Sequence, residues 1–222
     1  NMLMGIHGNV SLMMMDMGPS HPHHERLKKM EEHLHGGKKL TSHLLGYARK
    51  GRYDVKPINL NRILKDTSNT FGTTRRQITI HRELAEDLLE IEADQGQLEQ
   101  VLLNLYLNAA DAMEGSGKLI LTTMNATNKD MKGGPYEPKP GKYVQLTVTD
   151  TGTGMDQETL DRVFDPFFST KDAGAGIGLG LAAAYGIVKN HGGYIEVESL
   201  EGQGTSISVY LPAREEDRRK NG

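Results

Sequence analysis

The stretch from Gln97 to Met113 constrains the fold of this chain more than any other part of the sequence. It contains neither glycine nor proline, and Asp94 lies three residues upstream, in the position of a helix N-cap. At about 100° per residue, the predicted helix carries one narrow polar stripe. The stripe consists of Gln97, Gln100, Asn104, Asn108 and Asp111.

Apolar residues flank this stripe on both sides. One flank holds Leu98, Val101, Leu102, Leu105, Ala109 and Ala112, and the other holds Leu103 and Leu107. A surface helix usually has a broad charged face, whereas here a thin line of carboxamides lies between apolar walls. Because buried polar groups need partners, the stripe predicts either a ligand site or amides that cap a neighbouring strand edge.

Composition narrows the possible classes of protein. The chain has 222 residues, 25% of them charged, and a net charge of -3, so we expect no nucleic-acid partner. The absence of cysteine excludes disulfides and cysteine-ligated metals. No apolar run approaches the ~18 residues of a membrane span, and the N-terminus lacks the pattern of a signal peptide. We expect a cytoplasmic chain that is the cytosolic part of a larger protein.

Residues 1–53 are predicted to form a helical hairpin. Residues 1–16 and about 22–50 carry apolar seams with coiled-coil-like spacing, separated by Gly18, Pro19 and Pro22. The seams consist of Leu3, Ile6, Val10, Met13 and Met17, then Leu27, Met30, Leu34, Gly37, Thr41, Leu44 and Ala48. A lone hairpin cannot bury both seams, so we expect a homodimer that forms a four-helix bundle. Packing onto the rest of the same chain is the alternative.

The turn of this hairpin is rich in histidine. His21, His23 and His24 flank Pro22 and would suit either a metal site or a solvated turn. We interpret them as a solvated turn.

Residues 54–213 are predicted to form an α+β sandwich with helices on one face of a sheet, followed by a charged tail, 214–222. Gly51 to Pro57 is predicted to be a linker, and Asn59 the cap of a helix that ends near Phe71. A second helix is expected from Leu179 to His191. The expected strands are Gln77–Leu84, Leu88–Ala93, Lys118–Met124, Val144–Val148, Tyr194–Ser199 and Thr205–Leu211.

Three glycine clusters follow the Gln97–Met113 helix. Asp150-Thr-Gly-Thr-Gly154 puts a carboxylate at a strand end, where it can accept a hydrogen bond from an exocyclic amine such as that of adenine. Gly174-Ala-Gly-Ile-Gly-Leu-Gly180 leads directly into a helix, whose N-terminal N–H groups suit an anion. Gly202-Gln-Gly-Thr205 is a tight turn that ends in a hydroxyl. Three such clusters beside a carboxamide stripe favour a ligand site over simple turns.

Together these motifs resemble the Bergerat-type ATP-binding domain of sensor histidine kinases. The Gln97–Met113 helix resembles the N-box, Asp150–Gly154 the G1 box, Gly174–Gly180 the G2 box and Gly202–Thr205 the G3 box. Phe164-Asp-Pro-Phe-Phe-Ser-Thr-Lys171 resembles the F-box. The resemblance covers about residues 57–212 and is strongest to the nitrogen-regulation type of kinase. It implies that the hairpin is a dimerisation and phosphotransfer domain.

The resemblance also implies roles for individual residues. Asn108 would ligate Mg²⁺ on the ATP phosphates, with Asn104 in the same site, and Asp150 would hold the adenine amine. Gly152 and Gly154 would give the base room, and residues from about 156 to 175 would form a lid. Asn104 and Lys171 are the candidate catalytic residues. The full set of candidate ATP contacts is Asn104, Asn108, Asp111, Asp150, Gly152, Gly154, Lys171, Gly176, Gly178, Leu179, Gly180 and Thr205.

One part of the family pattern is missing. The family's phosphoacceptor histidine lies in a His-Asp-x-Asn-Asn motif, and Asn1 aligns with the last residue of that motif. The acceptor is therefore expected upstream of Asn1. His7 lacks an adjacent acidic residue and matches a position that accepts no phosphoryl group.

Three functions fit these patterns. The first is an ATP-dependent protein-histidine kinase core of a two-component system, which serves the receiver domain of a response regulator. The second is an ATP-hydrolysing clamp of the gyrase, mismatch-repair or heat-shock type, whose members carry a glutamate base where Asn104 stands. The third is a non-catalytic scaffold that binds nucleotide.

Overall fold

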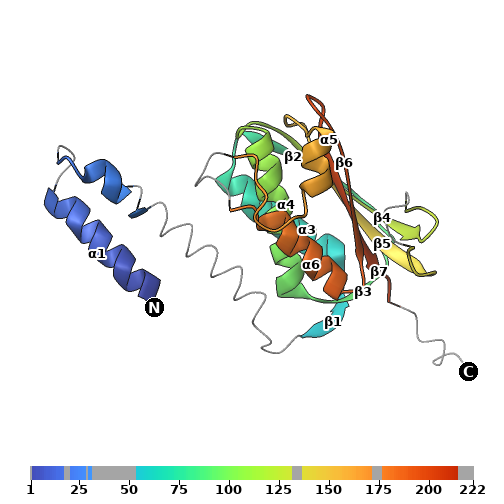
Figure 1. Ribbon diagram of the computed structural model, residues 1–222. Helices are drawn as coiled ribbons and strands as arrows, with labels where there is room; N and C mark the ends of the chain where they lie inside the picture. The colour runs from blue at the N-terminus through green and yellow to red at the C-terminus, as the bar shows by residue number, and fades with distance from the viewer. Residues whose placement is uncertain are drawn as a thin grey trace, which may run out of the picture. The chain divides into compact units, whose positions relative to one another are not determined.

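The computed structural model describes residues 2–17, 21–28, 30–31, 54–131, 137–171 and 177–214 (Figure 1). The chain divides into two compact units. The first comprises Asn1–Arg52 and Asp165–Leu179, and the second comprises Tyr53–Phe164 and Gly180–Gly222.

The first unit begins with the predicted N-terminal helix. Helix α1 spans Met2–Met17, and residues 24–28 and 30–31 are also helical. Ser11 Oγ donates a hydrogen bond to Glu31 Oε1 at 3.2 Å, so the two helical segments lie side by side. The rest of the predicted second helix, with the seam positions from Leu34 to Ala48, lies outside the described residues. Within the described part, Val10 and Leu27 are buried, whereas Met13 and Met30 are exposed.

The second unit is the predicted sandwich. Its main sheet has the strand order β2 (Ile78–Leu84), β4 (Gly117–Thr127), β5 (Lys142–Asp150), β7 (Gly204–Pro212) and β6 (Tyr194–Leu200). The β2–β4 pair is parallel and the other pairs are antiparallel. Helices α3 (Leu60–Thr74), α4 (Gln95–Ala112) and α6 (Gly180–Asn190) cover one face of it (Figure 1). The fold class is therefore confirmed.

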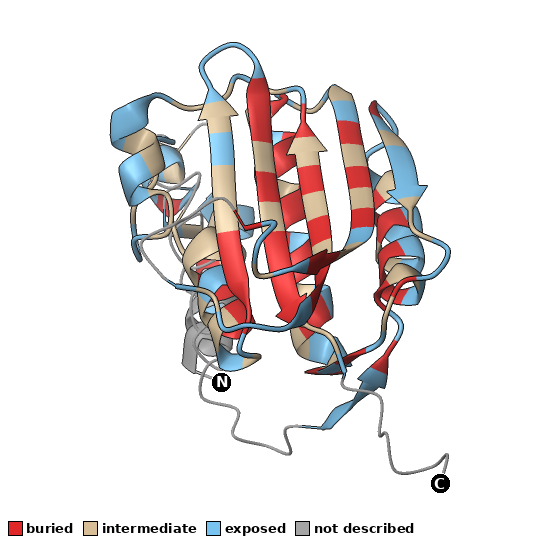
Figure 2. Cartoon of the chain, turned by 90° about the vertical axis from the view of Figure 1, so that its right-hand side faces the viewer, coloured by how far each residue is buried: buried red, intermediate tan, exposed pale blue. Residues whose placement is uncertain are grey.

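The core lies between this sheet and the three helices. Buried and partly buried residues alternate along the central strands, as the striping in Figure 2 shows, because successive side chains of a strand point to opposite faces. Leu102, Leu105 and Tyr106 of α4 and Leu119 and Leu121 of β4 are at most 1% exposed. Helix α4 is thus packed into the centre of the unit, which fixes the position of its polar stripe.

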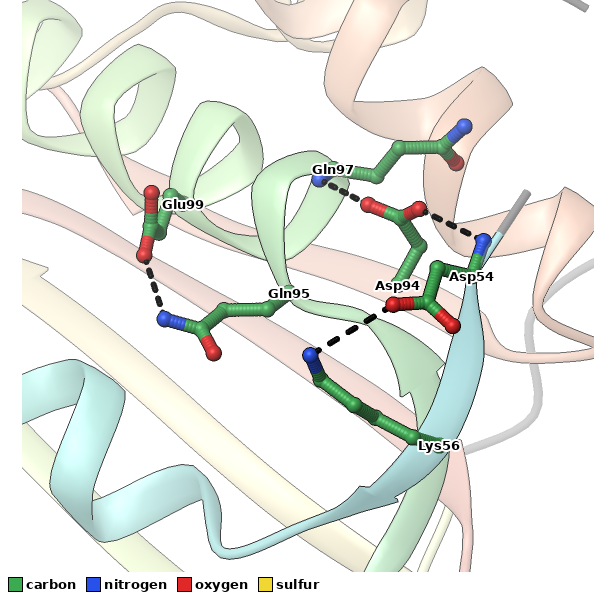
Figure 3. Close-up of polar contacts among 6 residues, drawn as sticks. All are labelled: Asp54, Lys56, Asp94, Gln95, Gln97 and Glu99. Atoms are coloured by element: carbon green, nitrogen blue, oxygen red, sulfur yellow. Dashed lines mark hydrogen bonds and ion pairs between the residues drawn. The ribbon is translucent and has the colours of Figure 1, made fainter. Parts of the chain in front are cut away.

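The N-terminus of α4 is held by Asp94 (Figure 3). One carboxylate oxygen, Oδ1, accepts the Gln97 N–H at 3.0 Å, and the other, Oδ2, accepts the Asp54 N–H at 3.1 Å. The Asp94 N–H donates to His191 Nε2 at 3.1 Å, just past the C-terminus of α6. The predicted cap is confirmed, and the same residue also joins β1 and α6 to the start of α4.

Several sequence predictions for this unit were wrong in detail. Residues 55–57, predicted to be the end of the linker, belong to strand β1 (Val55–Ile58), which pairs antiparallel with β3 (Ile91–Asp94) in a separate two-stranded sheet. The strand expected at Leu88–Ala93 is β3, which starts later than predicted, at Ile91. Asn59 stands at the N-cap position of α3 but makes no side-chain cap hydrogen bond.

A short helix, α5, spans Gln157–Arg162 before the F-box and is capped by Asp156. No helix in the described part of the chain is long and apolar enough to cross a membrane.

Candidate functional site

The carboxamide stripe of α4 contains polar atoms that are buried and unsatisfied. Asn104 is 5% exposed, and its Nδ2 has no hydrogen-bond partner among the described residues. The same holds, within the described residues, for Asn108 Nδ2 and for Gln97 Oε1. The alternative in which these amides cap a strand edge is therefore not observed. Since an unsatisfied buried donor costs about 1–3 kcal/mol, a ligand with acceptor atoms is the natural partner.

The first turn of α6 faces the two asparagines. A Cβ atom placed on Gly180 would lie 3.6 Å from Asn108 Nδ2 and 4.0 Å from Asn104 Cγ. Gly180 is the first residue of α6, whose N-terminal N–H groups have no partner within the helix. Two amide donors and a helix N-terminus thus lie together, and this combination favours an anion such as a phosphate.

Asp150 lies at the end of β5, buried to 7% exposure. Burial raises the pKa of its carboxyl, while hydrogen bonds from the N–H groups of Gly152 and Thr205 act in the opposite direction. The Gly152 N–H donates to Asp150 Oδ1 at 2.8 Å, which fixes the orientation of the carboxyl group. When ionised, this group only accepts hydrogen bonds, so it selects a ligand that donates.

The glycines beside Asp150 allow close packing of the backbone. A Cβ on Gly152 would lie 2.6 Å from the Ala112 carbonyl carbon, and one on Gly154 would lie 2.0 Å from the Leu200 carbonyl oxygen. We expected these glycines to make room for a base, but in the structure protein backbone occupies the space that their side chains would take. Gly204 has φ of +89°, and a Cβ on it would lie 2.1 Å from the Asp150 carbonyl oxygen.

Backbone hydrogen bonds join these turns to each other and to α4. The Thr153 N–H donates to the Ala112 carbonyl at 3.0 Å, and the Gly202 N–H donates to the Thr153 carbonyl at 2.6 Å. The turn after β5 is therefore held between the C-terminal end of α4 and the β6–β7 turn. This arrangement positions Asp150 and Thr205 relative to the asparagine stripe.

The first unit contains residues 165–171 of the F-box and residues 177–179 of the G2 box. The Phe167 N–H donates to the Gly178 carbonyl at 2.9 Å, and a Cβ on Gly178 would lie 2.2 Å from the Phe168 carbonyl oxygen. Gly178, with φ of +67°, thus lets the two motifs touch. Phe167 has φ of +68° and is 66% exposed. Phe164 belongs to the second unit, where its ring lies 5.3 Å from that of Tyr185.

The predicted site residues therefore fall into three groups. The second unit brings together Asn104, Asn108, Asp150, Gly152, Gly154, Gly180 and Thr205, with Asp111 exposed on the same helix as the asparagines. The first unit contains Lys171, Gly178 and Leu179, of which Lys171 is exposed. Gly176 lies outside the described residues.

A cavity of ≈ 580 Å³ lies at the other end of α6 from Gly180. It is lined by Val55, Glu92, Asn190, His191, Pro212, Ala213 and Arg214. It contains none of the predicted site residues, and its Arg214 guanidinium already pairs with Glu90 at 3.3 Å. The asparagine stripe, with its unsatisfied amides, is the better candidate for a site.

Comparison with known proteins agrees with the motifs. Residues 93–215 match the family described as histidine kinase-, DNA gyrase B- and HSP90-like ATPase, and this match covers more than half of the chain. The chain belongs to that family of ATPase domains.

Within the family, the chain is similar to sensor kinases. It is 33% identical over 221 residues to the sensor kinase CckA of Brucella abortus, and the aligned region covers 99% of this chain and 23% of CckA. It is also 33% identical over 198 residues to the sensor histidine kinase ZraS of Salmonella typhi, and this aligned region covers 87% of this chain and 39% of ZraS. The chain thus spans well under half the length of these curated relatives.

Solved structures share the fold over almost the whole chain. Full-length ShkA in complex with AMPPNP aligns with a TM-score of 0.68 at 24% identity, covering 96% of this chain and 43% of ShkA. The histidine kinase ThkA in complex with the response regulator protein TrrA aligns with a TM-score of 0.67 at 23% identity, covering 97% of this chain and 59% of ThkA.

Proposed function

We propose that this chain is the core of an ATP-dependent protein-histidine kinase in a two-component system. The observation that carries the proposal is the pair of buried amide nitrogens of Asn104 and Asn108, which have no hydrogen-bond partner in the described part of the chain and face the first turn of α6. Among sensor kinases, the nitrogen-regulation type remains our prediction for its subfamily.

The proposed nucleotide lies between Asp150 and α6. The Asp150 carboxylate accepts a hydrogen bond from the adenine amine, because it is buried, oriented by the Gly152 N–H and without donors of its own when ionised. The triphosphate extends toward Asn104, Asn108 and the N-terminus of α6, where buried amide donors and helix N–H groups match phosphate oxygens. AMPPNP, named in the ShkA complex, is an ATP analogue, in line with this assignment.

The residues present also fit a magnesium ion on the phosphates. Asn108 offers a neutral amide oxygen, the kind of single protein ligand that suits Mg²⁺ when phosphates and water supply the rest. A bound ion of this kind neutralises charge on the transferred phosphoryl group. The role of the protein side chains is to position the triphosphate and to exclude water.

Asn104 favours transfer over hydrolysis. An amide cannot accept a proton from water, so the position that carries a glutamate base in the clamp-type relatives has no base here. The acceptor is then a histidine side chain on the dimerisation helix, which we expect upstream of Asn1. Lys171, in the lid, is a further proposed phosphate contact.

We further propose that residues 1–53 form the dimerisation and phosphotransfer domain, 54–213 the catalytic domain and 214–222 a charged tail. Seam residues Met13, Met17 and Met30 are 49%, 39% and 53% exposed in the described part of the single chain. A second copy would cover these side chains in a four-helix bundle. The natural recipient of the phosphoryl group is the receiver domain of a response regulator, as the ThkA–TrrA complex suggests.

The proposal is tested by incubating the chain with Mg-ATP labelled at the γ-phosphate, with and without a polypeptide that carries the expected upstream helix. We expect acid-labile label on that polypeptide only, and its loss in Asn108→Ala. Label on this chain itself would place the acceptor within residues 1–222. Release of phosphate to water without any protein label would favour the hydrolase, and binding without turnover would favour the scaffold.

A further inference from the structure

Three polar side chains form a row across three adjacent strands at the edge of the proposed nucleotide site. Asp150 of β5 pairs with Thr205 of β7, and Thr205 pairs with Ser199 of β6. Of their neighbours two residues along each strand, Val148 and Ile207 belong to the core beneath the helices, and Val197 packs against it. All three side chains therefore lie on the helix-covered face of the sheet.

The Ser199 hydroxyl makes three hydrogen bonds. It accepts the Met155 N–H at 2.9 Å, donates to the Gly204 carbonyl at 3.0 Å and lies 2.9 Å from Thr205 Oγ1. A serine has one hydroxyl hydrogen, and the Gly204 carbonyl can only accept. In the third contact the Thr205 hydroxyl is therefore the donor and Ser199 Oγ the acceptor.

This arrangement determines what Thr205 offers to a ligand. With its hydrogen directed at Ser199, the Thr205 oxygen keeps only acceptor capacity, beside the Asp150 carboxylate. Two acceptors side by side match an amino group with two hydrogens, read directly or through a water molecule. The bond to Met155 also ties the first residue after the Asp150–Gly154 turn to the β6–β7 hairpin.

We propose that Ser199 is a positioning residue for nucleotide recognition: it holds the Thr205 hydroxyl as an acceptor and anchors Met155, the first residue after the Asp150–Gly154 turn. Ser199 itself is not proposed to touch the nucleotide. This inference rests on the proposed function, because it assumes that an adenine amine occupies the space in front of Asp150.

The test measures affinity for Mg-ATP and for the triphosphate of purine riboside, which lacks the 6-amino group. In Ser199→Ala we expect the affinity for ATP to fall about tenfold, the value of one hydrogen bond, and the affinity for the amine-free analogue to change little. Ser199→Thr, which keeps the hydroxyl, should retain most of the preference for ATP.

Ser206→Ala is the matched control. Ser206 is the next residue after Thr205 on β7, but its hydroxyl lies 2.8 Å from that of Thr149 on the opposite face of the sheet. Removing it deletes a similar hydroxyl pair, here between β7 and β5, so it should leave both affinities unchanged.

An equal fall for both nucleotides in Ser199→Ala, or no fall for either, would overturn the inference. If Ser199→Ala does not fold, Thr205→Val applies the same test, since it removes the hydroxyl that Ser199 orients. Failure of the wild-type chain to bind ATP would overturn the proposed function instead, and the two failures are therefore distinguishable.

Discussion

Asn108 of α4 and Gly180 of α6 face each other across the proposed phosphate site. The Asn108 Nδ2 atom is buried and unpaired among the described residues, and it would lie 3.6 Å from a Cβ added to Gly180. The two residues are separated by 71 intervening positions in the sequence, so the fold, and not local structure, brings them together.

This relationship predicts the effect of Gly180→Ala. The added methyl group makes only ordinary contacts with the protein, and alanine favours the helix, so the variant should fold with equal or slightly higher stability. The methyl would nevertheless occupy the space between the Asn108 amide and the helix N-terminus. We expect the Kd for Mg-ATP to rise about tenfold, the value of one lost hydrogen bond. Calorimetric titration and thermal denaturation of the same samples test both parts, and unchanged affinity would exclude this position for the phosphates.

Asn104→Leu should separate stability from function. The side chain is 5% exposed and its Nδ2 is unpaired among the described residues, so replacing it with an apolar group of similar size removes a desolvation cost. The free energy of unfolding without nucleotide should increase by about 1 kcal/mol. Phosphoryl transfer should be lost. Urea denaturation measures the first effect, and a less stable variant would mean that the amide has a partner that stabilises the fold.

The raised pKa of the Asp150 carboxyl predicts that ATP binding depends on pH. Burial raises the pKa of its carboxyl above the ordinary value, and only the ionised form accepts the adenine amine without competition. Affinity should be constant at neutral pH and fall as the pH drops through the raised pKa, by about tenfold per pH unit. A series of Kd measurements on wild type and Asp150→Asn checks this, since the variant should bind weakly at every pH.

The same raised pKa affects the stability of the fold in the opposite direction: ATP affinity should fall at low pH, whereas the contribution of Asp150 to stability should rise. A carboxyl whose pKa is higher in the folded state stabilises the fold when protonated, below the unfolded value, and this contribution is lost as the pH rises through the folded value. Asp150→Asn, which cannot ionise, should therefore melt a few degrees above wild type at neutral pH in the absence of nucleotide. A lower melting temperature would contradict the assigned cost of burial.

Two glycines of the β6–β7 turn provide a matched pair. Gly202 and Gly204 both have positive φ, at +77° and +89°, but a Cβ on Gly202 meets nothing within 4 Å, whereas one on Gly204 meets the Asp150 carbonyl oxygen at 2.1 Å. Gly202→Ala should cost about 1 kcal/mol from backbone strain alone. Gly204→Ala should cost roughly 3 kcal/mol or more, because it also displaces the backbone at Asp150. If both variants lost the same free energy of unfolding in chemical denaturation, the fold would not depend on the close approach of Gly204 to the Asp150 backbone.

Asp94, the N-cap of α4, is predicted to stabilise the second unit. Removing its carboxylate in Asp94→Ala deletes the cap on the Gln97 N–H and the bond to the Asp54 N–H (Figure 3). The loss should be about 1–2 kcal/mol. Asp94→Asn, which can still accept from Gln97, is the control and should lose less. Similar losses in both variants would show that the charge matters more than the cap.

The sequence predicted the helices and most strands because their patterns are long and periodic. The Gln97–Met113 helix was recognised from its stripe, its apolar flanks and the Asp94 cap, and all of these are features of local sequence. Leu103 is an exception, since it was assigned to an apolar wall and is 49% exposed. Strand β1 was missed because Lys56 and Pro57 break the expected alternation, and only its pairing with β3 makes it a strand.

The site was predicted as a set of residues but not as an arrangement. Glycine-rich turns indicated close approach, but the sequence alone did not show that Gly152, Gly154 and Gly204 approach protein backbone. Ser199 was missed, although the tight turn between β6 and β7 fixes its pairing with Thr205 and alternation puts both on one face. The register of a hairpin is thus a usable signal for polar pairs beside a site.

The most direct test of this account is the response of the asparagine side chains to nucleotide. In a ¹⁵N-labelled sample, the side-chain amide signals of Asn104 and Asn108, assigned by single substitutions, should shift on addition of Mg-ATP. Asn61 of α3 is the control: its side-chain amide already donates to the Ala85 carbonyl at 2.7 Å, so its signal should not shift. Saturation with ATP without a shift of either Asn104 or Asn108 would contradict the proposal that the nucleotide phosphates lie between α4 and α6.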